Sequence, residues 1–118
     1  MSERMKLVII ESPFRGKTDV EELENVEYAR RAMLDSLMRG EAPYASHLLY
    51  TQCLDDGNPD ERRLGITAGL EWGKKAELTA VYVDLGITAG MQIGIRAAER
   101  AGRRIEQRRI LASCGAGI

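Results

Sequence analysis

Three segments of this sequence bring together side chains suited to binding a small polar molecule. The first, Glu11–Lys17, follows a short apolar run and offers a hydroxyl, a guanidinium, a glycine backbone and an ammonium within a few residues, from Ser12, Arg15, Gly16 and Lys17. These groups suit recognition of a phosphate or a sugar diol, because guanidinium and ammonium groups bind anionic oxygens. The alternative interpretation is a solvated basic turn.

The second segment contains His47, the only imidazole of the chain. Its unperturbed pKa of ~6.5 suits acid–base chemistry. However, neither a second metal ligand nor a nucleophile stands beside it, so we interpret it as a ligand contact or a hydrogen-bonding residue. Asp55 and Asp56 beside Gly57 could bind a metal or a ribose. We favour a turn, because Asp-Asp-Gly-Asn-Pro has the residues that turns prefer.

The third segment is Asp84–Met91, with the sequence Asp-Leu-Gly-Ile-Thr-Ala-Gly-Met. Gly86 and Gly90 allow the backbone to approach a ligand, and Thr88 can cap a following helix. The N–H groups of a first helical turn favour an anion or an electron-rich ring. Glycine-rich turns also occur for packing alone, so this segment indicates a site only together with the other two.

The three segments are expected to meet because strands and helices alternate along the chain. Apolar patterning predicts strands at 6–10, 42–46, 79–83 and 104–111, and capping residues predict helices from Thr18 to Gly40, from Asn58 to about Lys75, and from Thr88 to about Ala101. The predicted fold is α/β, a three-layer Rossmann-like sandwich with a four- to five-stranded, mainly parallel sheet. It occupies residues 1–111, with a flexible tail at 112–118. Ligands of such sheets bind outside the carboxyl ends of the strands, where all three segments lie.

The residue spacing of two predicted helices, those that begin at Thr18 and at Asn58, predicts what their faces contact. The first helix has apolar residues at helical spacing, which predicts a buried face of Val26, Ala29, Met33 and Leu37. The second has a glycine at every fourth position, Gly65, Gly69 and Gly73, which would destabilise it unless something packs closely there. That contact is either a helix–helix dimer interface or the chain's own sheet. We expect a homo-oligomer, a dimer or higher.

Composition narrows the class of protein. The 118 residues are 44% hydrophobic and 30% charged, with a net charge of -1, as in a soluble globular domain and without the basic surplus that nucleic-acid binding needs. The apolar run Leu7–Ile10 is too short for a signal peptide or a membrane span, so we expect a cytoplasmic protein. Cys53 and Cys114 lack metal-ligand spacing, and we expect neither a metal nor another cofactor.

Several motifs together resemble the small nucleoside 2-deoxyribosyltransferase-like proteins, many of them uncharacterised proteins of phages and bacteria. The likeness spans about residues 6–110. It rests on Ser12-Pro13-Phe14-Arg15-Gly16, Asn25 with Tyr28-Ala29, Pro43 to Tyr50, Pro59-Asp60-Glu61-Arg62 with Gly65, and Gly86-Ile87-Thr88-Ala89-Gly90-Met91. The resemblance implies a pocket for a nucleotide or nucleoside derivative, with ligand-binding residues Ser12, Pro13, Phe14, Arg15, Lys17, Asn25, His47, Asp84, Thr88, Gly90 and Met91.

The resemblance also implies a catalytic carboxylate that this chain lacks. Transferases of this kind carry an Asp-x-Gly-Thr-x-x-Glu segment whose last residue is the nucleophile. Aligned with that segment, the chain has Thr88, Gly90 and Met91, and it has Gly94 in place of the nucleophile. Of the candidates to replace it, Asp84, Gln92 and Glu71, only Asp84 is expected at the correct edge of the sheet, so it is the predicted catalytic residue.

Three functions follow from these observations. The first is a protein that binds or sequesters a nucleotide or nucleoside derivative without the usual catalytic Glu. The second is an active deoxyribosyltransferase or nucleotide N-glycosidase with a relocated carboxylate, and the third is an oligomeric adaptor.

Overall fold

In the computed structural model, which describes residues 4–111, strands and helices alternate along the chain. The elements are β1 (Leu7–Glu11), α1 (Asp19–Met38), β2 (Ala42–Tyr44), α2 (Ser46–Leu49), a short 3-10 helix (Tyr50–Gln52), α3 (Pro59–Gly73), β3 (Leu78–Tyr82), α4 (Ala89–Arg100) and β4 (Arg104–Arg108). The tail predicted at 112–118, which includes Cys114, lies outside the described residues.

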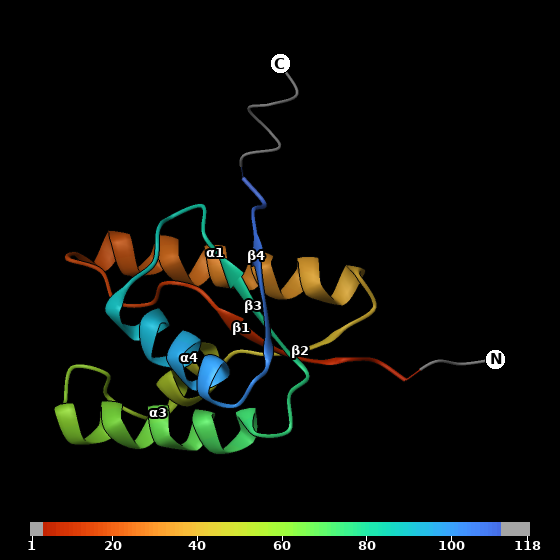
Figure 1. The fold of residues 1–118 in the computed structure, drawn as a ribbon. Helices are drawn as coiled ribbons and strands as arrows, with labels where there is room; N and C mark the ends of the chain where they lie inside the picture. Colours follow the sequence, from red (N-terminus) through yellow and green to blue (C-terminus); the bar gives the residue numbers. More distant parts are fainter. Residues whose placement is uncertain (1–3, 112–118) are drawn as a thin grey trace.

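The sheet has four parallel strands in the order β2-β1-β3-β4. Helix α1 covers one face, whereas α3 and α4 lie on the other (Figure 1). The chain moves outward from β1 to β2 and in the opposite direction from β3 to β4, so the strand order reverses between β1 and β3. The predicted three-layer Rossmann-like sandwich is confirmed, and its topological switch point lies between the carboxyl ends of β1 and β3.

The predicted capping residues do begin the three long helices. Side-chain oxygens accept hydrogen bonds from the first backbone N–H groups of α1, α3 and α4, and they belong to Thr18, Asn58 and Thr88. The Glu21 carboxylate accepts the N–H of Lys17, 2.9 Å away, so it ties the loop after β1 to the start of α1. Local sequence therefore fixes where the helices that surround the switch point begin.

The buried face of α1 differs from the prediction. Leu37 is exposed, and the buried residues are Asn25, Tyr28, Ala29, Ala32 and Ser36. Three of these are polar, and each hydrogen-bonds to a residue in a loop. Apolar periodicity misses such a face, because a polar side chain can be buried when its hydrogen bonds are made.

Strand β4 is shorter than predicted because the chain beyond it turns toward another partner. The backbone N–H groups of Ile110 and Leu111 donate to the Asp84 carboxylate, at 2.7 and 3.2 Å, rather than to a neighbouring strand. The chain after Arg108 therefore no longer pairs with β3.

Within the described residues, no helix combines the length and apolar character needed to cross a membrane.

Candidate functional site

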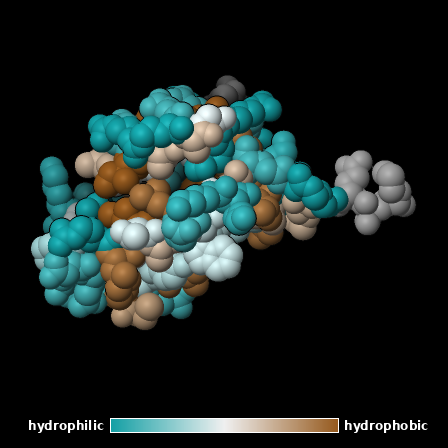
Figure 2. Space-filling model, turned by 60° about the horizontal axis from the view of Figure 1, so that its bottom comes forward, coloured by the Kyte–Doolittle hydropathy of each residue, from teal (hydrophilic) through white to brown (hydrophobic). Residues whose placement is uncertain are grey.

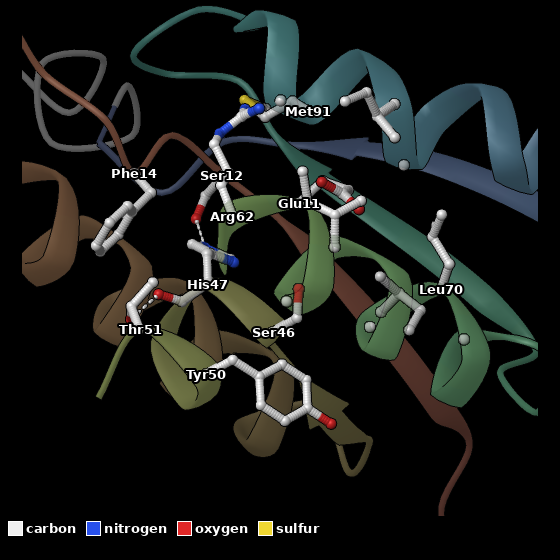
Figure 3. Close-up of a pocket in the computed structure, with 18 of the residues that line it drawn as sticks. Glu11, Ser12, Phe14, Ser46, His47, Tyr50, Thr51, Arg62, Leu70 and Met91 are labelled. Atoms are coloured by element: carbon white, nitrogen blue, oxygen red, sulfur yellow. Dashed lines mark hydrogen bonds between the residues drawn. The ribbon is translucent and has the colours of Figure 1, made fainter. Parts of the chain in front are cut away.

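A cavity of about 260 Å³ opens at the switch point, where sequence reasoning placed the site. Its walls come from the end of β1, from α2 and the 3-10 helix, from α3 and from the first turns of α4. Figure 3 shows Glu11, Ser12, His47 and Arg62 around this one space. The cavity therefore gathers side chains from four parts of the chain that are distant in sequence.

Asp56 and Glu61 line this cavity, but the Asp56 carboxylate lies beside Arg15 and the Glu61 carboxylate accepts the backbone N–H of Asp55. The third acidic residue of the lining is Glu11. It is the last residue of β1, and its side chain reaches the backbone of α4 at Gly94. A Cβ built on Gly94 would lie only 1.9 Å from Glu11 Oε2 and 2.4 Å from its Cδ. The Glu11 carboxyl group thus fills the space in which a side chain at position 94 would begin.

Burial determines the protonation of Glu11. Loss of water around the carboxylate raises its pKa to about 8, and the nearby positive charge of Arg103 partly opposes that rise. At pH 7 the Glu11 carboxyl group is therefore mostly protonated. Glu11 can therefore hold or release a proton close to neutral pH, which is a property of acids and bases in active sites.

Two hydrogen bonds hold Arg103, the residue whose positive charge acts on this carboxyl group. Its Nε donates to Thr79 Oγ1 and its Nη1 donates to the carbonyl oxygen of Gly73, both at 3.1 Å. These bonds join the start of β3, the end of α3 and the chain just before β4. A fixed positive charge stands near Glu11 without being neutralised by a direct hydrogen bond to it among the described contacts.

Ser12 and His47 form the second polar pair of the cavity. Ser12 Oγ and His47 Nε2 lie 2.7 Å apart, and Ser12 is only 5% exposed. Burial lowers the pKa of His47 to about 4, so the imidazole is neutral at physiological pH. A neutral imidazole bound through Nε2 keeps its other ring nitrogen for a ligand.

Asn25 of α1 holds the loop after β1 through hydrogen bonds to its backbone. Its amide nitrogen donates to the carbonyl oxygens of Phe14, at 3.1 Å, and Arg15, at 3.3 Å. Arg15 Nη1 in turn donates to the carbonyl oxygen of Asp56, 2.8 Å away, across the cavity mouth. Asn25 therefore acts on the loop that lines the cavity and does not itself line it.

The first turn of α4 forms another wall of the cavity. Thr88 Oγ1 accepts the N–H of Met91 at 3.2 Å, and Met91 is fully buried against the cavity. Gly90 allows close approach, because a Cβ there would lie 3.3 Å from the Arg62 guanidinium. No group of three or more His, Cys, Asp or Glu side chains within residues 4–111 is arranged to hold a metal ion.

A family model described as "Domain of unknown function (DUF7768)" matches residues 6–108. The chain belongs to this DUF7768 family. Its fold is similar to that of a solved 2-deoxyribosyltransferase from the psychrotolerant bacterium Bacillus psychrosaccharolyticus, with a TM-score of 0.62 over 87% of this chain and 72% of that chain, at 19% sequence identity. No curated protein matches the chain.

For the DUF7768 chain, most of the predicted ligand-binding residues do line the cavity. They are Ser12, Phe14, Arg15, His47, Thr88, Gly90 and Met91. Lys17 lines an adjoining hollow instead, and Pro13 is buried in the same loop without lining the cavity. The residue that sequence reasoning missed is Glu11. Two features of the sequence could have pointed to it: Glu11 is an acidic residue at the end of a buried strand, and the chain has glycine at position 94.

Asp84, the predicted catalytic residue, has other contacts. Its carboxylate accepts the Tyr28 hydroxyl at 3.0 Å, and it accepts the backbone N–H groups of Ile110 and Leu111. It is not among the residues that line the cavity. These contacts join α1, the end of β3 and the chain after β4, which favours a structural role.

Asp84→Asn should therefore destabilise the fold and leave the chemistry of the cavity nearly unchanged. Replacing one carboxylate oxygen by an amide nitrogen faces a donor with a donor, which costs about 1–3 kcal/mol in the free energy of unfolding. Urea unfolding measures that cost, and any enzymatic activity that the cavity has, assayed at a temperature where the variant is folded, should stay within about threefold of wild type. A folded Asp84→Asn variant without turnover would instead restore Asp84 as the catalytic acid.

The glycine-bearing face of α3 packs inside the chain. A Cβ at Gly69 would lie 2.7 Å from Ser46 Cβ, at Gly65 3.2 Å from Leu54, and at Gly73 3.4 Å from Ile9. The contact is within the chain, but only Gly73 packs on the sheet, against Ile9 of β1. Gly69 packs on α2, and Gly65 packs on the 3-10 helix and the chain just after it.

Other apolar side chains of α3 are exposed, Leu64, Leu70 and Trp72. Figure 2 turns the lower side of Figure 1, where α3 lies, toward the viewer, and hydrophobic side chains gather on that side. The homo-oligomer remains a prediction.

Proposed function

We propose that this protein binds a nucleoside derivative in the cavity and breaks its N-glycosidic bond, with Glu11 as the attacking carboxylate. The observation that carries the proposal is the contact between Glu11 and Gly94. The related transferases resembled by the sequence have a nucleophilic Glu at the position of Gly94. In this chain a carboxylate from β1 occupies the space beside that glycine.

The proposed chemistry has two steps. A Glu11 carboxylate oxygen forms a bond to the anomeric carbon while the bond from that carbon to the base nitrogen breaks, and the departing nitrogen takes up one proton. Water, or the nitrogen of a second base, then attacks the same carbon. The ester bond breaks, the carboxylate is regenerated, and the attacking group loses one proton.

Other cavity residues have supporting roles in this proposal. The Ser12–His47 pair presents a neutral ring nitrogen suited to a sugar hydroxyl or to the base. Arg103 favours the ionised form of Glu11, which is the form that attacks. The buried Met91 and the aromatic Tyr50 provide apolar contact for a flat heterocycle.

The test is the release of free base. Purified protein is incubated with the common 2′-deoxynucleosides and their 5′-monophosphates, and bases are separated by liquid chromatography over time. At least one substrate should release base linearly, and an added second base should yield a new nucleoside if transfer occurs. Flat time courses for all substrates, at pH 7 and pH 9, would contradict catalysis.

Binding without turnover is the second candidate function, and the high pKa of Glu11 favours it, because a protonated carboxyl group is a poor nucleophile. Under this alternative the protein would sequester or sense its ligand, in a bacterial or phage setting. Titration calorimetry would then show heat of binding for a ligand that the protein does not change.

A further inference from the structure

A second hollow adjoins the cavity and shares one wall with it. Five residues line both spaces, Arg15, Asp56, Arg62, Ile66 and Ile93. The second hollow is open to solvent. It is otherwise lined by the loop after β1, by the start of α1, and by the start of α3 with the loop before it. A ligand seated against Glu11 could therefore extend past the shared arginines into this hollow.

The shared arginine Arg62 has unused hydrogen-bonding capacity. Its side chain is 34% exposed, and its one ion pair, to Asp56, joins Nε and Oδ2 at 3.8 Å, too long for a hydrogen bond. Its guanidinium makes no hydrogen bond to any residue within the described 4–111 stretch. A half-buried guanidinium with its N–H donors unpaired beside a cavity is suited to a bidentate anion.

Asp56 sets the two shared guanidinium groups side by side. Its Oδ2 lies 3.6 Å from Arg15 Nη1 and 3.8 Å from Arg62 Nε. Arg15 has one hydrogen bond, to the Asp56 carbonyl oxygen, and Glu22 lies 3.9 Å from its Nε. Asp56 thus orients both arginines while leaving donors on each for a further acceptor.

The hollow as a whole is basic. Its lining contains four basic residues, Arg15, Lys17, Arg62 and Arg63, against two acidic ones, Glu21 and Asp56. Arg63 is paired with Asp60 on the surface, whereas the Lys17 ammonium has no ion-pair partner among residues 4–111. This surplus attracts a negatively charged group, and the chain as a whole, with a net charge of -1, supplies no such attraction.

We propose that the ligand of this cavity is a nucleoside 5′-phosphate, with its phosphate held by Arg62 and Arg15 in the adjoining hollow. The proposal rests on the proposed function for the position of the sugar. In a nucleoside 5′-phosphate, the phosphate is carried through C5′ on C4′, and the base is carried on C1′, across the ring oxygen. In this proposal the anomeric carbon lies at Glu11 and the phosphate lies in the adjoining hollow, which shares Arg15 and Arg62 with the cavity.

The test compares two substrates that differ only by the phosphate. For base release, kcat/KM is measured with a 2′-deoxynucleoside 5′-monophosphate and with the same deoxynucleoside. Wild type should prefer the monophosphate by roughly tenfold or more, as expected when charge-assisted hydrogen bonds are added. Arg62→Gln should lower kcat/KM for the monophosphate by roughly 10–100-fold and change that of the deoxynucleoside by less than about threefold.

Matched variants separate charge from folding. Arg30→Gln removes an exposed arginine on α1, away from both hollows, and should change neither substrate. Arg62→Lys retains the charge and should keep more of the preference than Arg62→Gln. If Arg62→Gln fails to fold, judged by thermal unfolding, Arg15→Gln takes its place with the same expected selectivity. An equal loss for both substrates would overturn the phosphate assignment.

A binding measurement distinguishes failure of this inference from failure of catalysis. Glu11→Gln protein is titrated in a calorimeter with the monophosphate, the deoxynucleoside and inorganic phosphate. Arg62-dependent binding of the monophosphate, without base release by wild type, would support the phosphate site and contradict catalysis. Base release at equal efficiency from both substrates would support catalysis and overturn the phosphate site. Neither binding nor release would overturn both.

Discussion

Glu11→Gln should abolish base release, lowering kcat by roughly 10³-fold or more, as the loss of a nucleophile does in enzymes that form covalent intermediates. The amide has the size of the carboxyl group and can keep its place beside Gly94, but it cannot form the ester bond to the anomeric carbon. Ligand binding should persist. The measurement is a single-turnover assay with calorimetry on the same protein.

The contact with Gly94 supplies a control that ordinary mutagenesis lacks. Gly94→Ala should displace the Glu11 carboxylate, because its Cβ would lie 1.9 Å from Oε2, and should lower turnover at least tenfold with Glu11 still present. In a Glu11→Ala background, Gly94→Glu should be tolerated and should restore part of the lost activity. Restoration would show that two places on the fold can carry one carboxylate.

Two results would contradict the role of Glu11. Full turnover by folded Glu11→Gln would exclude it as the nucleophile. Gly94→Ala protein with unchanged activity would show that the position of the carboxylate does not matter. Exposed Glu71, which pairs with Lys74 on the surface of α3, gives the matched substitution Glu71→Gln, and that variant should keep wild-type activity.

The rate of base release should rise with pH, with a midpoint of about 8. Glu11 attacks only when ionised, and burial raises its pKa to about 8. Between pH 6 and pH 8 its ionised fraction grows roughly 50-fold, and kcat/KM should follow it. Arg103→Gln should move the midpoint above 8, since the positive charge of Arg103 lowers the pKa of Glu11. A rate that falls through pH 8 would make Glu11 a general acid instead.

The same titration should appear in stability with the opposite trend. The folded-state pKa of Glu11 lies above the ordinary value of 4.5, so protonation favours the folded protein. That contribution is complete below about pH 4.5 and is lost as the pH rises through about 8. Glu11→Gln removes this dependence, so the variant should lose less stability than wild type between pH 5 and pH 9. Urea unfolding at both pH values measures the difference.

Much of the architecture could be predicted because local rules govern it. Thr18, Asn58 and Thr88 begin helices through their own side chains, and the apolar runs between the helices form strands. The face of α1 could not be predicted from the same rules. Tyr28 is buried because its hydroxyl meets Asp84 and the backbone N–H of that residue, which are 56 positions away in sequence.

Sequence alone determined that three segments rich in polar groups lie at one edge of a parallel sheet, because alternating strands and helices bring the carboxyl ends of the strands together. Tertiary structure alone decided that Glu11 lines the cavity and Asp84 does not. Asp84 stands at the same edge but is held by backbone N–H groups, whereas Glu11, at the end of β1, reaches Gly94 of α4. The direction and surroundings of a side chain depend on contacts between distant segments, and no local pattern encodes them.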